Sequence, residues 1–143
     1  MTQMAKLFRA LADANRLRIV NLLSERSICV CDLQSVLGLS QPFISRHLAY
    51  LRRVGLVRDR REGTRVCYSL APDLPAIQAL RAFLREVLLT SETFQADLRL
   101  LNTLESLGRL KSLGLRIVSS AADSTSPVSN EGQGKKDADA RAA

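Results

Sequence analysis

Two cysteines one residue apart are the residues of this chain best suited to bind an ion. Cys29 and Cys31 lie at the start of a predicted helix over about residues 30–37. Thiolates are soft ligands that select thiophilic ions, and cysteines near a helix amino terminus have a lowered pKa, which increases the thiolate fraction. Asp32 opposes this effect with its negative charge, although it also complements the helix dipole. The pair predicts a site for a thiophilic metal or metalloid ion; the alternative is two small cysteines that only pack.

The spacing of this pair predicts a change of shape on ligand binding. In a regular helix the side chains of residues i and i+2 point about 200° apart, so they cannot hold one ion together. Joint ligation by Cys29 and Cys31 therefore requires the first helical turn to be extended or distorted. If another function of the protein needs that turn to be helical, the ion and that function favour different geometries of one segment, which is what a switch requires.

Apolar spacing and capping residues predict the elements around this pair. Helical periodicity predicts helices over about residues 4–12, from Asp13 to about residue 23, over 30–37, and from Ser40 to about residue 54. The short turn 38–40 between the last two of these is typical of a helix-turn-helix. Two β-prone runs follow, at 56–60 and 65–70, joined by the hairpin turn Arg61-Glu-Gly-Thr. We therefore expect a mainly α fold with a small β-hairpin wing, a winged helix-turn-helix, within a domain over residues 1–107 whose wing covers about 56–70.

A long helical region follows the wing. Apolar residues recur at helical spacing through residues 73–107, with a candidate break at Thr90-Ser91. Their apolar surface is larger than a small winged-helix domain can cover, so we predict a homodimer interface here. The alternative is an intramolecular helix pair. Residues 119–143 contain almost no large apolar side chains, and we expect this tail to be disordered.

Positive charge is confined to the first half of the chain. The whole chain carries a net charge of +7, and residues 1–70, with 12 basic and 5 acidic residues, account for all of it. Seven basic and two acidic residues lie between Arg46 and Arg65. A local basic patch of this kind is typical of a protein that contacts the phosphates of double-stranded DNA, although a solvated surface has the same composition.

The helix after the turn has the pattern of a DNA-reading helix. On a helical wheel Ile44, Leu48 and Leu51 share the core face, and the opposite side is polar or small. Arg can bind guanine and Gln adenine through two hydrogen bonds. The arginines of the hairpin are better placed to hold phosphates than to read bases. The predicted DNA contacts are Gln41, Ser45, Arg46, Ala49 and Arg53 on the helix and Arg58, Arg60, Arg61 and Arg65 on or beside the wing.

His47 is the single histidine of the chain and lies at the edge of the core face of that helix. A role in the scaffold or in phosphate contact is favoured, and base contact is the alternative. A metal role is disfavoured because no second histidine or carboxylate stands at ligand spacing.

Four segments together resemble the ArsR–SmtB family, and its arsenic-responsive repressors in particular. They are the segments beginning Leu11-Ala-Asp-Ala-Asn-Arg, Ile28-Cys-Val-Cys-Asp-Leu, Leu39-Ser-Gln-Pro-Phe-Ile and Arg61-Glu-Gly-Thr-Arg-Val. The resemblance covers about residues 4–107. It implies a homodimer formed through the first helix (about 4–12) and the long C-terminal helices (about 73–107), and repression of a resistance operon until the inducer binds. It places Cys29 and Cys31 on the arsenite-binding motif, and Ser45, Arg46 and His47 on the recognition helix.

The chain departs from the family pattern at one ligand position. Many arsenite sensors of this type have a third cysteine three residues after the second, and Gln34 stands there in this chain. Cys67 is a further candidate ligand, because in winged helices the segment before the third helix often pairs with the second wing strand. However, Val66, Tyr68 and Leu70 are expected to share the inward face of that strand, which turns Cys67 outward.

The resemblance implies an inducer, arsenite or another trivalent arsenical or antimonite, and no permanently bound cofactor. The long C-terminal region lacks the histidines of a zinc or nickel site, and the chain lacks the cysteine-bearing N-terminal extension of cadmium and lead sensors, although these metals remain an alternative. A second alternative is a thiol redox sensor that joins Cys29 to Cys31. Three cysteines are too few for a disulfide framework, so we expect reduced thiols. No nucleophile with a base indicates an enzyme, and no apolar run indicates a membrane span or signal peptide, so we expect a cytoplasmic protein.

Overall fold

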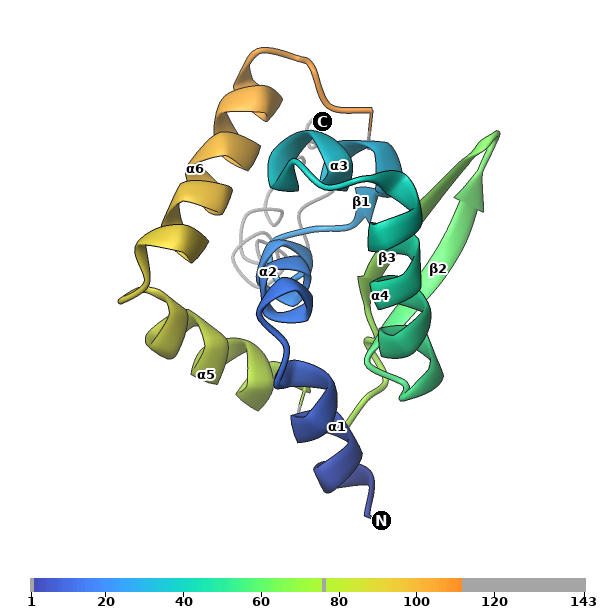
Figure 1. The fold of residues 1–143 in the computed structure, drawn as a ribbon, viewed down its shortest axis with the longest axis vertical. Coiled ribbons are helices and arrows are strands. Elements are labelled where there is room, and N and C mark those ends of the chain that lie inside the picture. Colours follow the sequence, from blue (N-terminus) through green and yellow to red (C-terminus); the bar gives the residue numbers. More distant parts are fainter. Residues whose placement is uncertain (1, 76, 112–143) are drawn as a thin grey trace, which may run out of the picture.

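The computed structural model describes residues 2–75 and 77–111, and the predicted disordered tail at 119–143 lies outside them. Six helices and three strands follow one another in this part of the chain (Figure 1). In chain order they are α1 (Gln3–Leu11), α2 (Ala14–Leu23), β1 (Ile28–Cys29), α3 (Val30–Leu37), α4 (Gln41–Arg53), β2 (Val57–Glu62), β3 (Arg65–Leu70), α5 (Ile77–Leu88) and α6 (Glu92–Ser106). The expected mainly helical fold with a small hairpin wing is confirmed.

Local capping explains why α3 ends and α4 begins where the sequence predicts. Helix α3 ends at Gly38, whose φ of 69° is the left-handed conformation that favours glycine. Ser40 caps α4 by accepting a hydrogen bond from the Phe43 N–H at 3.3 Å, and Pro42 occupies the first turn, where its missing N–H costs nothing. The two helices and the short turn between them form the helix-turn-helix.

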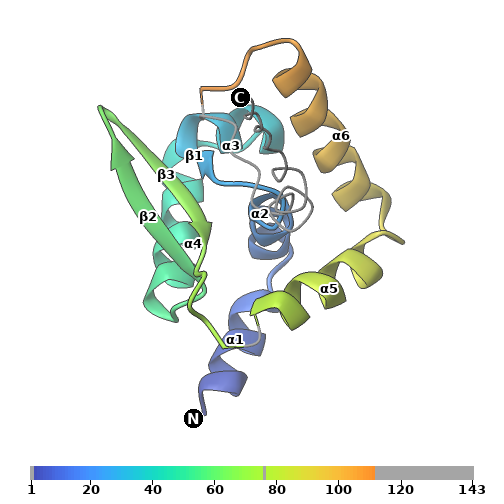
Figure 2. The ribbon, with the colours of Figure 1, turned by 180° about the vertical axis from the view of Figure 1, so that it is seen from behind.

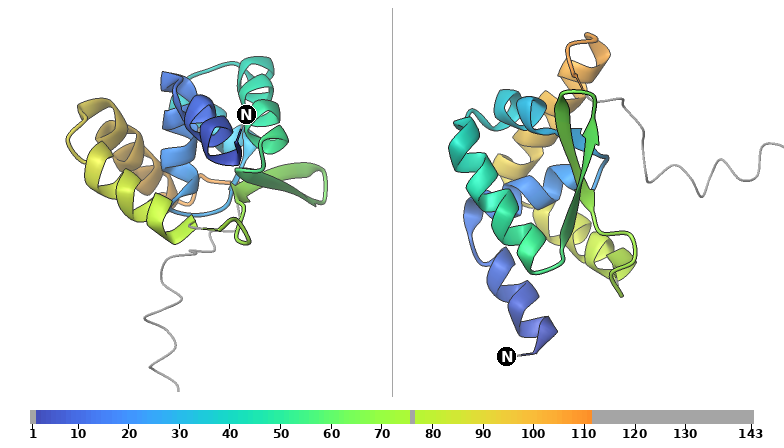
Figure 3. Two further views of the ribbon diagram at one scale, coloured as in Figure 1. Left: turned by 90° about the horizontal axis from the view of Figure 1, so that it is seen from below. Right: turned by 90° about the vertical axis from the view of Figure 1, so that its right-hand side faces the viewer.

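A three-stranded antiparallel sheet places the wing beside α4. The strand order is β1-β3-β2, so the short strand before α3 pairs with the second strand of the hairpin. Cys29 lies opposite Cys67 in this pairing, and Arg60 of β2 lies opposite Cys67 on the other side. The hairpin turn is shorter than expected, because β2 continues to Glu62 and only residues 63 and 64 make the turn. Figures 2 and 3 show the hairpin extending beyond the helical body next to α4.

The core lies between α2, α3 and α4 and the base of the wing. Ile44, Leu48 and Leu51 of α4 are all fully buried, as the helical wheel predicts. They join fully buried side chains of the other elements, among them Ile19, Leu22, Leu33 and Leu56. Burying a side chain of this size stabilises the fold by about 1.5–3 kcal/mol, so this core holds α4 in place and leaves its polar side outward.

The long C-terminal helical region is two helices, because the chain turns after residue 88 and α6 starts at Glu92. Helix α6 lies across α2 on the side away from α4 and the wing (Figure 1). Two ion pairs attach it: Arg18 binds Asp97 through two hydrogen bonds of 2.8 and 2.9 Å, and the buried Arg26 pairs with Glu105 at 2.5 Å. Helix α6 therefore packs against α2 of its own chain.

No helix within residues 2–75 and 77–111 combines the length and apolar character that crossing a membrane requires.

The Arg18–Asp97 ion pair is expected to stabilise the docking of α6. Asp97 is 5% exposed, so replacing it by Asn leaves a partly buried guanidinium without its charged partner. We expect Asp97→Asn to lower the free energy of unfolding by about 2 kcal/mol, measured by urea denaturation at a fixed protein concentration. Glu92→Gln is the control on the same helix, because it breaks a pair in which both side chains are more than half exposed and is expected to cost under about 0.5 kcal/mol. Equal effects of the two substitutions would contradict this prediction.

Candidate DNA-binding surface and cysteine site

The outward side of α4 carries most of the side chains predicted to read DNA. Gln41, Arg46 and Arg53 are exposed, and Ser45 and Ala49 are half-buried. The Gln41 side-chain amide donates a hydrogen bond to the Ser45 hydroxyl at 2.8 Å, which holds both side chains at the amino-terminal end of the helix. This arrangement presents an amide and two guanidinium groups along one side of a helix, with a short residue between the arginines.

The His47 ring packs against its own helix in this structure. It is half-buried, and its ring packs edge-on against Phe43 with 4.7 Å between the ring centroids. The Arg46 guanidinium lies over the same Phe43 ring, 5.8 Å from the ring centroid. These contacts favour the scaffold interpretation of His47, and a base contact stays untested.

The arginines of the wing differ in how they are held. Arg58 forms an ion pair with Asp73, and Arg60 binds the Glu62 carboxylate through two hydrogen bonds of 3.1 and 2.6 Å. Arg61 and Arg65 are exposed, and no ion pair engages them within the described part of the chain. Arg61 and Arg65 are therefore better disposed toward phosphate than the two paired arginines.

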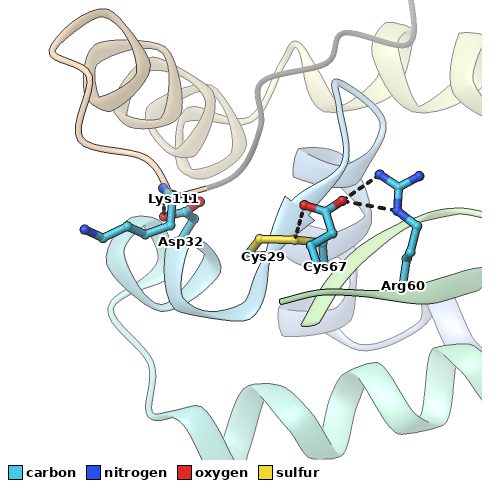
Figure 4. Close-up of a disulfide and its surroundings, with 6 residues drawn as sticks. Cys29, Asp32, Arg60, Cys67 and Lys111 are labelled. Atoms are coloured by element: carbon cyan, nitrogen blue, oxygen red, sulfur yellow. Dashed lines mark hydrogen bonds and ion pairs between the residues drawn. A yellow bond between two sulfur atoms is a disulfide. The ribbon is translucent and has the colours of Figure 1, made fainter. Parts of the chain in front are cut away.

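Cys29 lies immediately before α3, as the predicted helix over residues 30–37 implies. Cys29 precedes the first turn of α3 as its N-cap residue, with extended φ and ψ of −77° and 155°. The backbone is thus extended at Cys29, while Cys31 lies within the helix. Its sulfur is joined to that of Cys67 in a disulfide (Figure 4), so the expectation of three reduced thiols is wrong. The physical reason is the pairing of β1 with β3, which sets these two residues opposite each other.

The expected outward orientation of Cys67 is also wrong, since Cys67 is only 2% exposed. Side chains do alternate along β3, so Cys67 faces away from Val66 and Tyr68. The face of the sheet that carries Cys67 is nevertheless buried, because Cys29 of β1 lies on the same face. Sequence alternation identifies the two faces but not what covers each of them.

Cys31 is not brought together with the other two cysteines. It is exposed at the second residue of α3, while Cys29 is 1% exposed. Within the described residues, the ligand atoms of Cys29, Glu62 and Cys67 all lie within 4.8 Å of one another, and Cys31 is outside that group. The predicted Cys29–Cys31 chelate therefore needs a movement of the first turn of α3.

Glu62 is the member of this group that the sequence prediction missed. It was expected in the hairpin turn, where a side chain has no fixed neighbour. In the structure it ends β2 two residues after Arg60, so it shares the face that carries Arg60 and Cys67. Its Oε1 lies 3.6 Å from the Cys67 sulfur and its Oε2 accepts from Arg60. A correct hairpin register would have been the signal that finds it.

A cleft of about 340 Å³ lies between the start of α3, the wing and the side of α4 that is predicted to read DNA. Its lining includes Cys29, Cys31 and Gln34 before and within α3, Gln41 and Ser45 on α4, and Thr64, Arg65 and Tyr68 on the wing. Burial raises the pKa of Tyr68, and the nearby Asp59 carboxylate raises it further, so the phenol that lines this cleft stays neutral.

Asp32 connects the start of α3 to the chain beyond α6. It is 2% exposed, and its two carboxylate oxygens accept the Lys111 backbone N–H at 2.8 and 2.9 Å (Figure 4). As a carboxylate in the first turn of α3 it also lies in the favourable field of the helix dipole.

Comparison with known proteins places these features in one family. The model of the bacterial regulatory protein arsR family matches residues 13–59, from α2 into the wing. The chain is 57% identical over 72 residues to the arsenical resistance operon repressor of Escherichia coli, a match that covers 50% of this chain and 62% of that relative, less than two thirds of its length. It is 37% identical over 83 residues to a cadmium resistance transcriptional regulatory protein CadC homolog of Staphylococcus aureus, covering 57% of this chain and 69% of the relative.

A solved structure shares the architecture. The homodimeric winged helix-turn-helix DNA-binding domain of a possible ArsR-family regulator from Mycobacterium bovis aligns with a TM-score of 0.54 at 34% identity, covering 59% of this chain and 77% of that domain. The shared winged helix, the match of the family model and the identity to relatives of which more than two thirds is covered all agree: the chain belongs to the arsR family of bacterial regulatory proteins.

Proposed function

We propose that this chain is a homodimeric transcriptional repressor that leaves an inverted-repeat operator when trivalent arsenic or antimony binds its cysteines. The cleft between α3, α4 and the wing carries this proposal, because its walls include Cys29 and Cys31 and also Gln41 and Ser45 of the DNA-reading helix. An ion that displaces the start of α3 changes the cleft on which α4 and the wing both depend. The name of the Escherichia coli relative, an arsenical resistance operon repressor, supports the same inducer class.

Homodimerisation is supported by an apolar surface on α1 and α5. Met4, Phe8, Phe83 and Val87 are between 45% and 59% exposed, which is unusual for such side chains on one surface. A cleft of about 240 Å³ between α1, α5 and the segment before α5 is lined almost entirely by apolar residues, among them Leu7, Leu11, Leu74 and Leu80. A second copy that packs its own α1 and α5 here would bury this surface and place two recognition helices on successive turns of DNA, about 34 Å apart.

Release from DNA requires the inducer to favour a different geometry of α3 from the one that DNA favours. In the reduced chain, one ion bound to Cys29 and Cys31 pulls the first turn of α3 toward β1. Trivalent arsenic commonly binds three sulfurs, and Cys67, opposite Cys29 in the sheet, supplies the third sulfur that Gln34 cannot. This displacement of α3 then distorts the helix-turn-helix that α3 and α4 form.

A second candidate function, thiol redox sensing, is supported by one observation. Cys29 is joined to Cys67, so an oxidant acts on the strand pair β1–β3 rather than on Cys29 and Cys31. An operator-release assay that adds an oxidant to the reduced protein tests it directly.

The dimer surface predicts that a charge in its centre separates the subunits. Phe8→Glu places a carboxylate where two copies would exclude water, and we expect a monomer at micromolar concentration with operator affinity lowered at least tenfold. Light scattering after size exclusion measures the mass. Lys6→Glu, a charge change on the same helix at an exposed position, is the control and is expected to stay dimeric. A dimeric Phe8→Glu protein would exclude this surface.

The two groups of arginines are expected to affect DNA binding differently. Arg46→Ala removes a base-reading side chain, and we expect operator affinity to fall by about 10- to 100-fold, with lost discrimination at one base pair of each half-site. Arg61→Ala removes a phosphate contact and should weaken operator and unrelated DNA alike, with a shallower salt dependence. Fluorescence anisotropy at several salt concentrations measures both. Arg99→Ala on α6 is the control, and an unchanged affinity for Arg46→Ala would contradict the assignment of α4.

The inducer site predicts loss of release without loss of DNA binding. Reduced Cys29→Ser should bind the operator with unchanged affinity, yet arsenite, a monomethyl arsenical or antimonite should no longer release it, because the shared sulfur is gone. Cadmium, lead and an oxidant are the parallel titrations. Ser35→Ala, which changes the same helix without changing a sulfur, is the control. Arsenical release that survives Cys29→Ser would overturn this site.

A further inference from the structure

We propose that Cys29, Cys67 and Glu62, once the disulfide is reduced, bind one thiophilic divalent cation of the zinc or cadmium class. This inference goes beyond the proposed function, because the site needs neither DNA nor an arsenical. It shares Cys29 and Cys67 with the proposed inducer site but uses Glu62 in place of Cys31, so its ligands come from three strands of the sheet and none from α3.

Strand pairing brings the three ligands to one place. Residues opposite each other in neighbouring strands share a face of the sheet, so the face of Cys67 on the central strand β3 also carries Cys29 of β1 and Arg60 of β2. Glu62 lies two residues after Arg60 and is therefore on the same face. The ligand atoms of all three residues lie within 4.8 Å of one another, a separation that a small movement of the side chains converts to ligation of one ion.

The ligand types favour a divalent cation over a trivalent arsenical. Two thiolates and one carboxylate supply three negative charges, and sulfur together with carboxylate oxygen is a ligand set that zinc accepts in its usual four-coordinate sites, with the fourth position left to water. Trivalent arsenic in the proposed inducer site uses sulfur alone. The hard carboxylate oxygen of Glu62 thus has a role with a divalent ion that it lacks with the metalloid.

Arg60 prepares the carboxylate for this role. Both hydrogen bonds from Arg60 go to Oε2 of Glu62, at 3.1 and 2.6 Å, while Oε1 is the oxygen 3.6 Å from the Cys67 sulfur. Hydrogen bonds from a neighbour to a ligating carboxylate are a common way of fixing its orientation in metal sites. The Arg60 charge also offsets part of the negative charge that two thiolates and a carboxylate would bring together.

The site is sheltered yet open on one side. Cys29 and Cys67 are 1% and 2% exposed, and the Glu62 side chain retains 20% exposure. The partly exposed Glu62 carboxylate marks the open side, from which an ion would reach the two sulfurs. Partial burial of thiolates strengthens their attraction to a cation, because few water molecules compete with it.

Cation binding and the disulfide exclude each other. A phosphine reductant breaks the S–S bond, takes the oxygen of one water molecule to become a phosphine oxide, and leaves two thiols that carry the two protons of that water. The cation then displaces both protons as it binds the thiolates. The disulfide has no thiolate to offer, so only the reduced chain binds the ion.

The test is a cadmium titration of the full chain, reduced with a phosphine and desalted under nitrogen, without DNA or arsenical. Ultraviolet absorption from thiolate-to-cadmium charge transfer counts the sulfurs, and a competing chelator gives the affinity. We expect one ion with two thiolates. Cys67→Ser should halve the band and weaken binding at least tenfold, and Glu62→Gln should keep the band but weaken binding by about 10- to 100-fold. Cys31→Ser is the matched control and should change neither.

Three results would overturn the proposal. They are loss of the band in Cys31→Ser with retention in Cys67→Ser, an unchanged affinity in Glu62→Gln, or equal binding by the disulfide form. Glu62→Gln changes a partly exposed side chain at a strand end, so its outcome does not depend on a core substitution being tolerated. Because the titration contains no arsenical, its failure leaves the proposed inducer site standing, and failure of arsenical release leaves this site standing.

Discussion

The pairing of the two-residue strand β1 with β3 is the interaction on which the rest of this molecule depends. It sets Cys29 opposite Cys67 and holds Cys29 in extended conformation immediately before α3. The same pairing attaches the wing to the start of the helix-turn-helix, so α3, α4 and the hairpin meet around one cleft. Without it, the cysteine at the head of α3 and the cysteine of the wing would belong to separate parts of the chain.

The helix-turn-helix could be predicted from the sequence because its signals are local. Asp13 and Ser40 cap helices through their own side chains, and Gly38 ends α3 with the positive φ that the turn needs. The apolar spacing of Ile44 and Leu48 then identifies the buried side of α4, since a helix repeats its faces every 3.6 residues. Each of these inferences depends on residues within a few positions of one another, which is the range over which sequence patterns carry structural information.

The cysteine site could not be predicted in the same way because it depends on contacts between distant segments. Alternation along β3 puts Cys67 and Tyr68 on opposite faces of the sheet. However, the residue that covers the face of Cys67 is Cys29, which is 38 positions away in the sequence. The position of Glu62 follows from where the hairpin turns, and the observed two-residue turn moved Glu62 from an expected loop into a strand. Helix α6 shows the same limit: its apolar face was visible, yet the ion pairs through Arg18 and Arg26 decide that it packs on its own chain.

In the structure Cys29 has Cys67 as its partner, and in the proposed inducer complex Cys31 joins them; the difference between these two states is the proposed physical basis of a switch. With Cys67 as the partner, Cys29 stays in the sheet and α3 keeps a regular first turn, anchored by Asp32 to the Lys111 backbone. With Cys31 as the partner, that turn must deform, and the deformation acts against the Asp32 contact and the packing of α3 on α4. A ligand changes DNA affinity only to the extent that it distinguishes these two geometries. In the proposed mechanism Cys29 is shared by both states, so whatever engages Cys67 determines how freely Cys29 can turn toward α3, and the sheet rather than the helix sets the threshold for release.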